Sequence, residues 1–302
     1  IVPANFEYFK NTQSIAYNSI AGLRLNGNQT RTYPQKSWRL YAEDYYQSST
    51  FEYPFFENTY INNYSRLILR NAGNDWEKGF IRDQLAHSIG KNLNKYLIHS
   101  PVKNVLTFLN GKFYGISNLI ERHDKSFFEN QYNIDKNSIT MAEFVTYYIL
   151  PTTKYGSPYL NLTEWFEFFD TLNFLDMHNN GLEYIESKID IENFIDYFIL
   201  NIFIQNRDWL SNNVLFWKSN ELDNKWRWKI NDMDVSFAFD KKLSESHNNY
   251  FELLTSNSYI CNLLKTLFKS KVFLNKFLNR FADLLNTEFL PKNIIPKIDN
   301  IS

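Results

Sequence analysis

Alternating apolar and polar positions predict strands in the first third of the chain. Residues 20–25 form a short apolar run that ends at Asn26-Gly27-Asn28, and asparagine and glycine are residues that turns favour. Residues 36–40 alternate, which places their tryptophan and leucine on one face of a strand and a serine and an arginine on the other. Residues 67–69 indicate a further strand.

The strongest short-range signal is a hairpin. Residues 105–109 and 113–119 are two strand-like runs on either side of Asn110-Gly111. This dipeptide suits a two-residue hairpin turn, because both positions of that turn need a positive φ.

A helix is expected between these strands, over about residues 77–97, with Asn74 and Asp75 as possible caps. Apolar residues at helical spacing form its inner stripe: Phe80, Ile81, Leu85 and Ile89.

Beyond the hairpin the pattern becomes helical. Residues 162–169 and 191–204 are the clearest helical segments, and Asp190 is a natural N-cap for the second. That helix is apolar nearly all round, so it should be buried. From about residue 250 onward we expect two or three amphipathic helices.

Together these patterns predict an α+β chain, and a length of 302 residues suggests one large domain or two closely packed lobes. The polar residues 121–124 are the expected hinge. Residues 1–120 would form a β-rich N-lobe, and residues 121–302 would form a mainly helical C-lobe.

Composition narrows the classes of function. The 302 residues carry a net charge of −1, which argues against a nucleic-acid partner, because such binding needs clustered Lys and Arg. The single cysteine, Cys261, cannot form an internal disulfide, and no Cys/His spacing indicates a zinc site. The most apolar run, residues 194–204, is too short to span a membrane. Nothing resembles a signal peptide at the start of the sequence given. The compartment and the oligomeric state are not indicated.

Acidic and amide side chains gather around the buried helix and the strands that follow it. Asp208 and Asn213 lie in the loop after the helix, and Asp232 and Asp234 follow two short strands at residues 214–218 and 226–230. Because a hairpin of these strands folds back, we expect the four side chains to converge. Such oxygen ligands suit a hard cation such as Mg²⁺.

The spacing also matches the catalytic loop of protein kinases, in which His-Arg-Asp is followed by Asn five positions after the Asp. Here Asn206-Arg207-Asp208 keeps the arginine, the aspartate and the interval to Asn213. Asp232-Met233-Asp234 would occupy the metal-binding Asp-Phe-Gly position, with Asp232 as the principal ligand. The alternative is structural, since a lone aspartate near a helix end is commonly a cap or a solvated loop residue.

Three residues in the first part of the chain are candidates for nucleotide binding. Lys36 could neutralise phosphates, although a lysine on a strand is more often simply solvated. The turn at Gly27 could offer backbone N–H groups to phosphates or be a plain hairpin turn. Glu121 could contact the adenine amino group or cap a helix. The helix with Arg82-Asp83 could supply a partner for Lys36 or a surface ion pair.

Several stretches together resemble the CotH family, atypical kinases first associated with bacterial spore coats. The resemblance covers about residues 20–240, and the stretches that carry it are Asn26-Gly27-Asn28-Gln29-Thr30-Arg31, residues 33–40, Leu69-Arg70-Asn71, Asn74-Asp75-Trp76, Ile81-Arg82-Asp83, residues 110–115, Leu119-Ile120-Glu121, Asn206-Arg207-Asp208-Trp209 with Asn212-Asn213, and residues 228–237.

This resemblance implies a two-lobed protein-kinase-like fold, ATP with Mg²⁺ or Mn²⁺, and transfer of a phosphoryl group to Ser or Thr of a protein substrate. By position, Lys36 would contact the phosphates and Asp208 would be the catalytic acid/base. Asn213, or alternatively Asn212, would hold metal together with Asp232.

Two other functions are compatible with the sequence. A kinase-like fold can instead adenylylate or glutamylate a protein, and a non-catalytic scaffold of a spore coat or cell surface is the alternative outside enzymes. The cluster of Asp208, Asn213, Asp232 and Asp234 argues against a scaffold, which has no need of it.

Overall fold

A computed structural model describes residues 1–11, 14–57, 61–144, 151–155, 158–209, 212–239 and 258–301. Contacts divide the chain into two compact units, and each unit is described by itself. The first consists of Ile1–Phe80 and Ser100–Lys136, and the second of Ile81–His99 and Asn137–Ser302. The sequence placed a boundary at residue 120, whereas the observed units change after Phe80, His99 and Lys136.

The difference in boundaries has a local cause. Helix α2 (Lys125–Tyr132) packs on strand β5 of the first unit, so the chain leaves that unit only after it. The segment Ile81–His99 packs with the second unit, where its helix α1 (Arg82–Gly90) contacts the C-terminal helix α8 (Pro291–Ile301).

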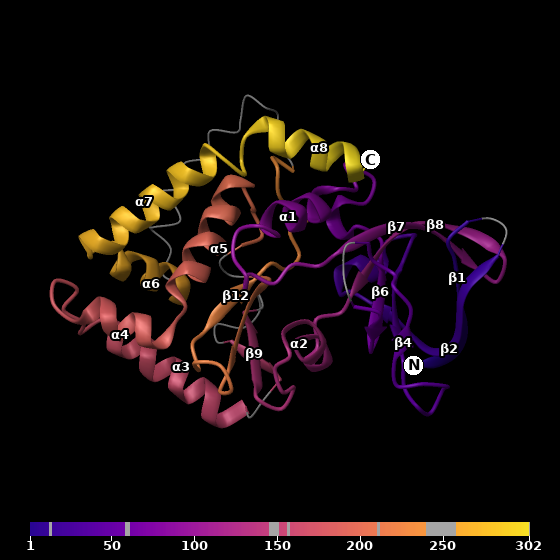
Figure 1. Ribbon diagram of the computed structural model, residues 1–302, viewed down its shortest axis with the longest axis horizontal. Helices are drawn as coiled ribbons and strands as arrows, with labels where there is room; N and C mark the ends of the chain where they lie inside the picture. Colours follow the sequence, from indigo (N-terminus) through magenta and orange to yellow (C-terminus); the bar gives the residue numbers. More distant parts are fainter. Residues whose placement is uncertain are drawn as a thin grey trace. The chain divides into compact units, whose positions relative to one another are not determined.

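The first unit is built on a curled, antiparallel six-stranded sheet of order β1-β2-β3-β6-β8-β7 (Figure 1). Its strands are β1 (Val2–Phe9), β2 (Ile15–Asn26), β3 (Ser37–Tyr41), β6 (Arg66–Arg70), β7 (Val102–Leu109) and β8 (Lys112–Glu121). A short pair, β4 (Phe51–Glu52) and β5 (Asn63–Tyr64), adds large rings to its core. The largest buried side chains of this core are aromatic: Phe51, Phe55 and Tyr64.

The predicted hairpin is confirmed. Strands β7 and β8 pair in antiparallel fashion, and the turn between them has φ of 50° at Asn110 and 75° at Gly111. The polar break after β8 is the start of a helix, because the Asp124 carboxylate accepts hydrogen bonds from the N–H groups of Ser126 and Phe127 and caps α2.

The second unit has a four-stranded sheet of order β10-β9-β11-β12 surrounded by helices. The strands are β9 (Ile139–Phe144), β10 (Thr152–Tyr155), β11 (Val214–Ser219) and β12 (Arg227–Lys229). Besides α1 and α8, the helices are α3 (Pro158–Leu172), α4 (Gly181–Lys188), α5 (Ile191–Phe203), α6 (Tyr259–Leu267) and α7 (Lys271–Leu285). The predicted helices at residues 162–169 and near the C-terminus are therefore confirmed, although residues 240–257 lie outside the described part.

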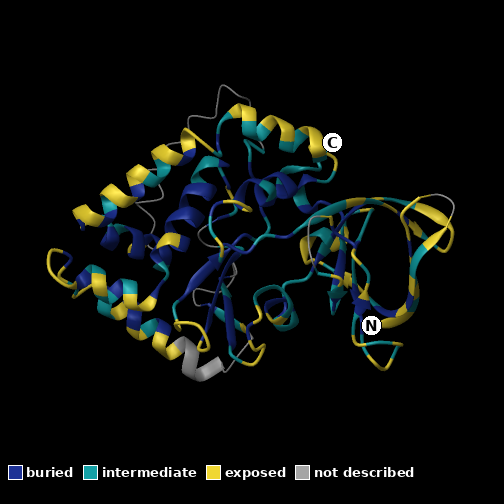
Figure 2. Cartoon of the chain, in the orientation of Figure 1, coloured by how far each residue is buried: buried dark blue, intermediate teal, exposed yellow. Residues whose placement is uncertain are grey.

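Helix α5 is the buried centre of this unit, as its apolar pattern predicted. Figure 2 shows it buried along its length, whereas α7 and α8 each expose one face. The Asp190 side chain accepts a hydrogen bond from the N–H of Asn193 and caps the helix, which confirms the predicted cap.

The helix predicted over residues 77–97 is much shorter than expected. Glu77 and Phe80 have φ of 65° and 64°, so the backbone before Ile81 cannot be helical. Asp75 closes this turn instead, because its side chain accepts a hydrogen bond from the N–H of Gly79. The predicted inner residues Leu85 and Ile89 are buried, as expected.

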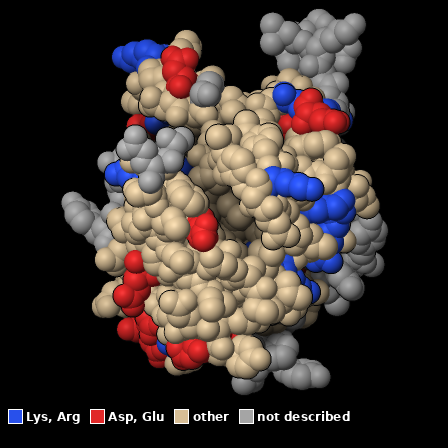
Figure 3. Space-filling model, turned by 90° about the vertical axis from the view of Figure 1, so that its right-hand side faces the viewer, with Lys and Arg blue, Asp and Glu red and all other residues tan. Residues whose placement is uncertain are grey.

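Two surface properties complete the description. On the face that Figure 3 draws, the described Lys and Arg side chains and the Asp and Glu side chains form small separate groups on a largely uncharged surface. Among the described residues, no helix combines the length and the apolar character needed to cross a membrane.

Candidate active site

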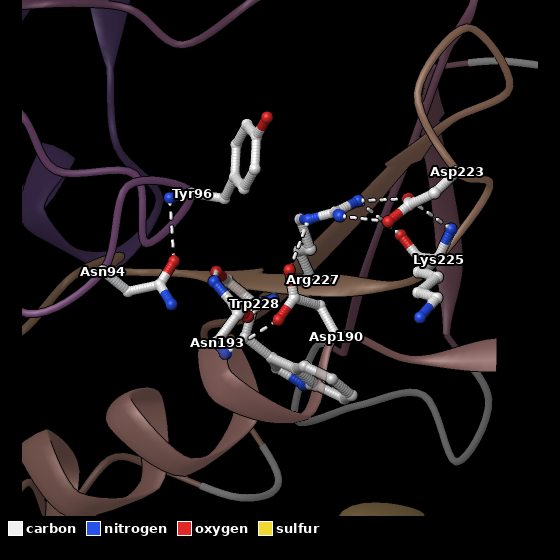
Figure 4. Close-up of polar contacts among 8 residues, drawn as sticks. All are labelled: Asn94, Tyr96, Asp190, Asn193, Asp223, Lys225, Arg227 and Trp228. Atoms are coloured by element: carbon white, nitrogen blue, oxygen red, sulfur yellow. Dashed lines mark hydrogen bonds and ion pairs between the residues drawn. The ribbon is translucent and has the colours of Figure 1, made fainter. Parts of the chain in front are cut away.

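One end of helix α5 is fixed to strand β12. The N–H of Asp190 donates to the Trp226 carbonyl at 3.0 Å. The Asn193 side chain makes two hydrogen bonds to the backbone of Trp228, accepting from its N–H at 2.6 Å and donating to its carbonyl at 3.1 Å (Figure 4). Helix and strand therefore start side by side.

Arg227 reinforces the same junction. Its guanidinium donates to the Asp190 carboxylate at 2.9 Å and to the two Asp223 oxygens at 2.8 and 2.7 Å (Figure 4). It also lies over the rings of Tyr96 and Trp217. This cluster was not predicted from the sequence, although an arginine between two tryptophans in a strand was a signal for it.

The other ends of the helix and the strand converge on the candidate loop. The Arg207 N–H donates to the Val235 carbonyl at 3.0 Å, and the Phe237 N–H donates to the Ile204 carbonyl at 2.6 Å. The loop after α5 therefore lies alongside the acidic segment after β12. Strands β11 and β12 form the antiparallel hairpin that the sequence predicted.

Asp208 is held by two amides within this loop. Its Oδ2 accepts hydrogen bonds from Nδ2 of Asn212 at 2.8 Å and from Nδ2 of Asn213 at 2.7 Å. Asn213 has a φ of 58°, a left-handed conformation that asparagine tolerates better than most residues. Both amides that the sequence left as alternatives thus contact the same carboxylate.

The environment of Asp208 disfavours its negative charge. Burial raises the pKa of its carboxyl group, and the nearby charge of Asp232 raises the pKa further, against the hydrogen bonds from Asn212 and Asn213. Asp208 and Asp232 therefore lie close enough to repel each other. A group that supplied positive charge here would relieve this repulsion.

The acidic segment itself contains one partly exposed and one buried carboxylate. Asp232 has a φ of 55° and is partly exposed, whereas Asp234 is only 1% exposed. The Asn231 side chain donates to the Asn213 carbonyl at 3.4 Å and links this segment to the loop.

The oxygen atoms around Asp208 fit a hard cation, but they come from fewer carboxylates than the three that the sequence predicted. The described residues contain no group of three or more His, Cys, Asp or Glu side chains arranged to hold a metal ion. The two neighbouring carboxylates, Asp208 and Asp232, and the oxygen of Asn213 remain. Because Nδ2 of Asn213 faces Asp208, its Oδ1 is the atom suited to a cation.

Asn206 connects the loop, the helix and the acidic segment. Its Oδ1 accepts a hydrogen bond from the N–H of Asp208 at 3.2 Å. Its Nδ2 donates to Oδ1 of Asn201 in α5 at 2.9 Å and contacts Sδ of Met233 at 3.0 Å. This residue stands where the kinase loop has histidine, and in this chain it acts as a buried connector.

Lys229, at the end of β12, is a buried lysine that was not predicted from the sequence to belong to the site. Its Nζ donates to Oδ1 of Asn231 at 3.4 Å. Burial lowers its pKa to about 7, and Lys154 adds to this, while the charges of Glu143, Asp83 and Asp232 oppose it. A lysine between a tryptophan and an isoleucine, on a strand flanked by large apolar residues, was the available signal.

Lys36 and Gly27 belong to the first unit. Lys36 directly precedes β3, its N–H donates to the Tyr114 hydroxyl at 2.6 Å, and its Nζ donates to the Tyr33 carbonyl. Gly27 has a φ of 91°, and a Cβ there would lie 2.2 Å from Oγ1 of Thr30, so this turn requires glycine. Phosphate binding by either residue stays a prediction.

Glu121 also lies in the first unit, at the end of β8, and is 3% exposed. Nε2 of Gln131 in α2 donates to its Oε2 at 3.2 Å. Burial raises the pKa of Glu121 to about 8 with help from the charge of Asp124, and the bond from Gln131 opposes this. Its carboxyl group therefore faces a helix of its own unit, and a contact with adenine stays a prediction.

A family model described as "CotH kinase protein" matches residues 23–302 of the chain. The match includes the second unit, the first unit from residue 23 onward, and all the candidate residues named above. No curated protein matches the chain.

Proposed function

Since the chain belongs to the CotH kinase protein family, we propose that it transfers the γ-phosphoryl group of ATP to a Ser or Thr hydroxyl of a protein. The proposal includes a kinase-like arrangement in which the two compact units act as lobes. Fold likeness alone does not define a reaction, so the proposal depends on the candidate site.

The observation that carries the proposal is the environment of Asp208. Two amides hold its carboxylate, and its loop lies along the acidic segment through the bond from the Arg207 N–H to the Val235 carbonyl. These contacts support the proposal, because in protein kinases a positioned Asp lies beside metal-binding Asn and Asp side chains.

Each candidate residue has a role in this proposal. Asn213 and Asp232 would hold Mg²⁺ or Mn²⁺, with Asp234 as a buried support, and the ion would supply positive charge to the phosphates of ATP. Lys36 and the turn at Gly27 would bind the phosphates, and Glu121 would bind the adenine.

The chemistry of Asp208 would be that of a positioning base. The acceptor hydroxyl oxygen forms a bond to the γ-phosphorus, the bond from that phosphorus to the β–γ bridging oxygen breaks, and ADP leaves. The hydroxyl proton passes to the Asp208 carboxylate. The hydrogen bonds from Asn212 and Asn213 hold this carboxylate in place for the transfer.

The test compares Asp208→Ala with Asp170→Ala, which removes an exposed aspartate of α3. With radiolabelled ATP, autophosphorylation of Asp208→Ala should fall by roughly 10²–10⁴-fold, while Asp170→Ala stays at the wild-type level. Unchanged incorporation in Asp208→Ala would remove this residue from the mechanism. Intact-mass measurement identifies the added group, and an adenylyl or glutamyl group would replace the kinase reaction with another transfer.

A further inference from the structure

The helix α1 segment supports the acidic segment at three places, all within the second unit. Oδ1 of Asp83 accepts a hydrogen bond from the N–H of Met233 at 2.7 Å. The Ile230 N–H donates to the Ile98 carbonyl at 3.0 Å. At Gly90 the helix lies so close that an added Cβ would be 2.1 Å from Cδ1 of Ile230.

Met233 is the residue through which this support reaches the acids, because it lies between Asp232 and Asp234. Its N–H donates to Asp83, its carbonyl accepts a hydrogen bond from the Ser236 hydroxyl at 2.6 Å, and its sulfur contacts Asn206. Its side chain is 1% exposed. Backbone and side chain are therefore fixed on three sides.

The bond to Asp83 fixes a backbone that is otherwise unfavourable. Asp232 has a φ of 55°, which costs conformational energy for a residue with a Cβ. The peptide group that follows Asp232 carries the N–H bonded to Asp83, and a charged acceptor makes this one of the stronger kinds of hydrogen bond. Asp83 thereby restrains the backbone from which the Asp232 side chain projects.

The surroundings of Asp83 fit a permanent structural contact. Asp83 is 7% exposed, and Nε2 of His87, one turn further along α1, lies 3.8 Å from its Oδ1. The buried Lys229 is influenced by the charges of both Asp83 and Asp232. Of the two alternatives that the sequence left open for Arg82-Asp83, a surface ion pair does not apply to Asp83, because this side chain is buried.

We infer that Asp83 is a positioning residue for the proposed metal site: it sets the geometry of Asp232 by holding the N–H of Met233. The inference rests on the proposed function for the identity of the ligand. Helix α1 would then also influence the metal site, because a shift of this helix would release the N–H of Met233 and weaken metal binding.

The test uses Mn²⁺ in the presence of ATP as the probe and measures its binding by electron paramagnetic resonance. Asp83→Ala removes the acceptor and should weaken Mn²⁺ binding by about tenfold or more, as changes behind a metal ligand do. Asp83→Asn keeps an oxygen acceptor of the same shape and should recover most of that loss.

The outcomes distinguish this inference from the proposed function. If the wild-type chain binds no Mn²⁺ with ATP, the proposed function fails. If the wild type binds and Asp83→Ala binds equally well, the inference fails. Should Asp83→Ala not fold, Asp83→Leu fills similar space without an acceptor and replaces it. If Asp83→Asn is as weak as the acceptor-free variant, the hydrogen bond is not what matters and the inference is overturned.

Discussion

Helix α5 and strand β12 lie side by side, and charged side chains are paired differently at their two ends. At the starting end, Arg227 lies between Asp190 and Asp223, and each charge faces an opposite charge. At the other end, the carboxylate of Asp208 is bonded to amides while the acid Asp232 lies nearby. The first arrangement neutralises charge within the protein, and the second gathers negative charge.

The pKa shifts at the two ends follow this difference. Burial opposes the charge of Arg227, but hydrogen bonds and charges of Asp223 and Asp190 outweigh it and raise the pKa of the guanidinium. Burial works against the charge of Asp223 as well, yet Arg227 lowers its pKa. At Asp208 burial and Asp232 together raise the pKa. The ion-paired end, formed by Arg227, Asp190 and Asp223, thus contributes to stability. The acidic end, formed by Asp208 and Asp232, is suited to a cationic ligand.

The largest effect of a single substitution is expected when the ion-paired end is broken. Arg227→Ala leaves Asp190 without its cation and removes the contacts with Tyr96 and Trp217, so the free energy of unfolding should fall by about 3 kcal/mol. We place this near the lower limit for buried pairs because Asp223 is partly solvated. Urea denaturation measures it.

Lys225→Ala is the matched control for this prediction. Lys225 contributes its backbone N–H to Asp223, and that bond survives the substitution. Its effect should stay within about 0.5 kcal/mol, as for most surface changes. Equal losses in Arg227→Ala and Lys225→Ala would show that the charge pairing at this end has no special weight.

A pH-dependent effect is expected at Glu121, a buried acid whose hydrogen-bond partner is an amide, as at Asp208. Its pKa is about 8 in the folded chain against an ordinary value of 4.5, so its contribution to stability is complete below pH 4.5. As pH rises, the unfolded chain loses this proton first. Stability should therefore fall by up to about 1.4 kcal/mol per pH unit until the pH passes 8.

Glu121→Gln removes the titration and keeps an oxygen to accept from Gln131. Thermal unfolding between pH 5 and 9 should show a shallower decline for this variant than for the wild type. Parallel curves for the two proteins would contradict the raised pKa of Glu121 and, with it, the distinction between amide-held and ion-paired acids.

Local patterns predicted what depends on neighbouring residues. Three features could be predicted because each depends on a few adjacent positions. They are the turn at Asn110-Gly111, the cap at Asp190 and the buried helix that follows this cap. The position of the candidate loop was predictable for the same reason, since a helix and a hairpin of known spacing bring Asp208 and Asp232 near each other.

Contacts between distant segments were not predictable in this way. Asp83 and Met233 are 150 positions apart, and nothing in their local patterns pairs them. The start of α1 was misplaced because Glu77 and Phe80 adopt positive φ, which neither residue type favours. Such features depend on how the whole unit packs, and the packing of distant segments cannot be derived from local patterns in one sequence.

The most direct test of the acidic end is the binding of Mn²⁺ in the presence of ATP, followed by electron paramagnetic resonance on the wild type, Asp232→Asn and the control Asp170→Asn. The wild type and the control should bind Mn²⁺ with the same affinity, and Asp232→Asn should lose most of this binding. Equal binding by Asp232→Asn and the wild type, or none by the wild type, would contradict a metal–nucleotide site at this end of the second unit.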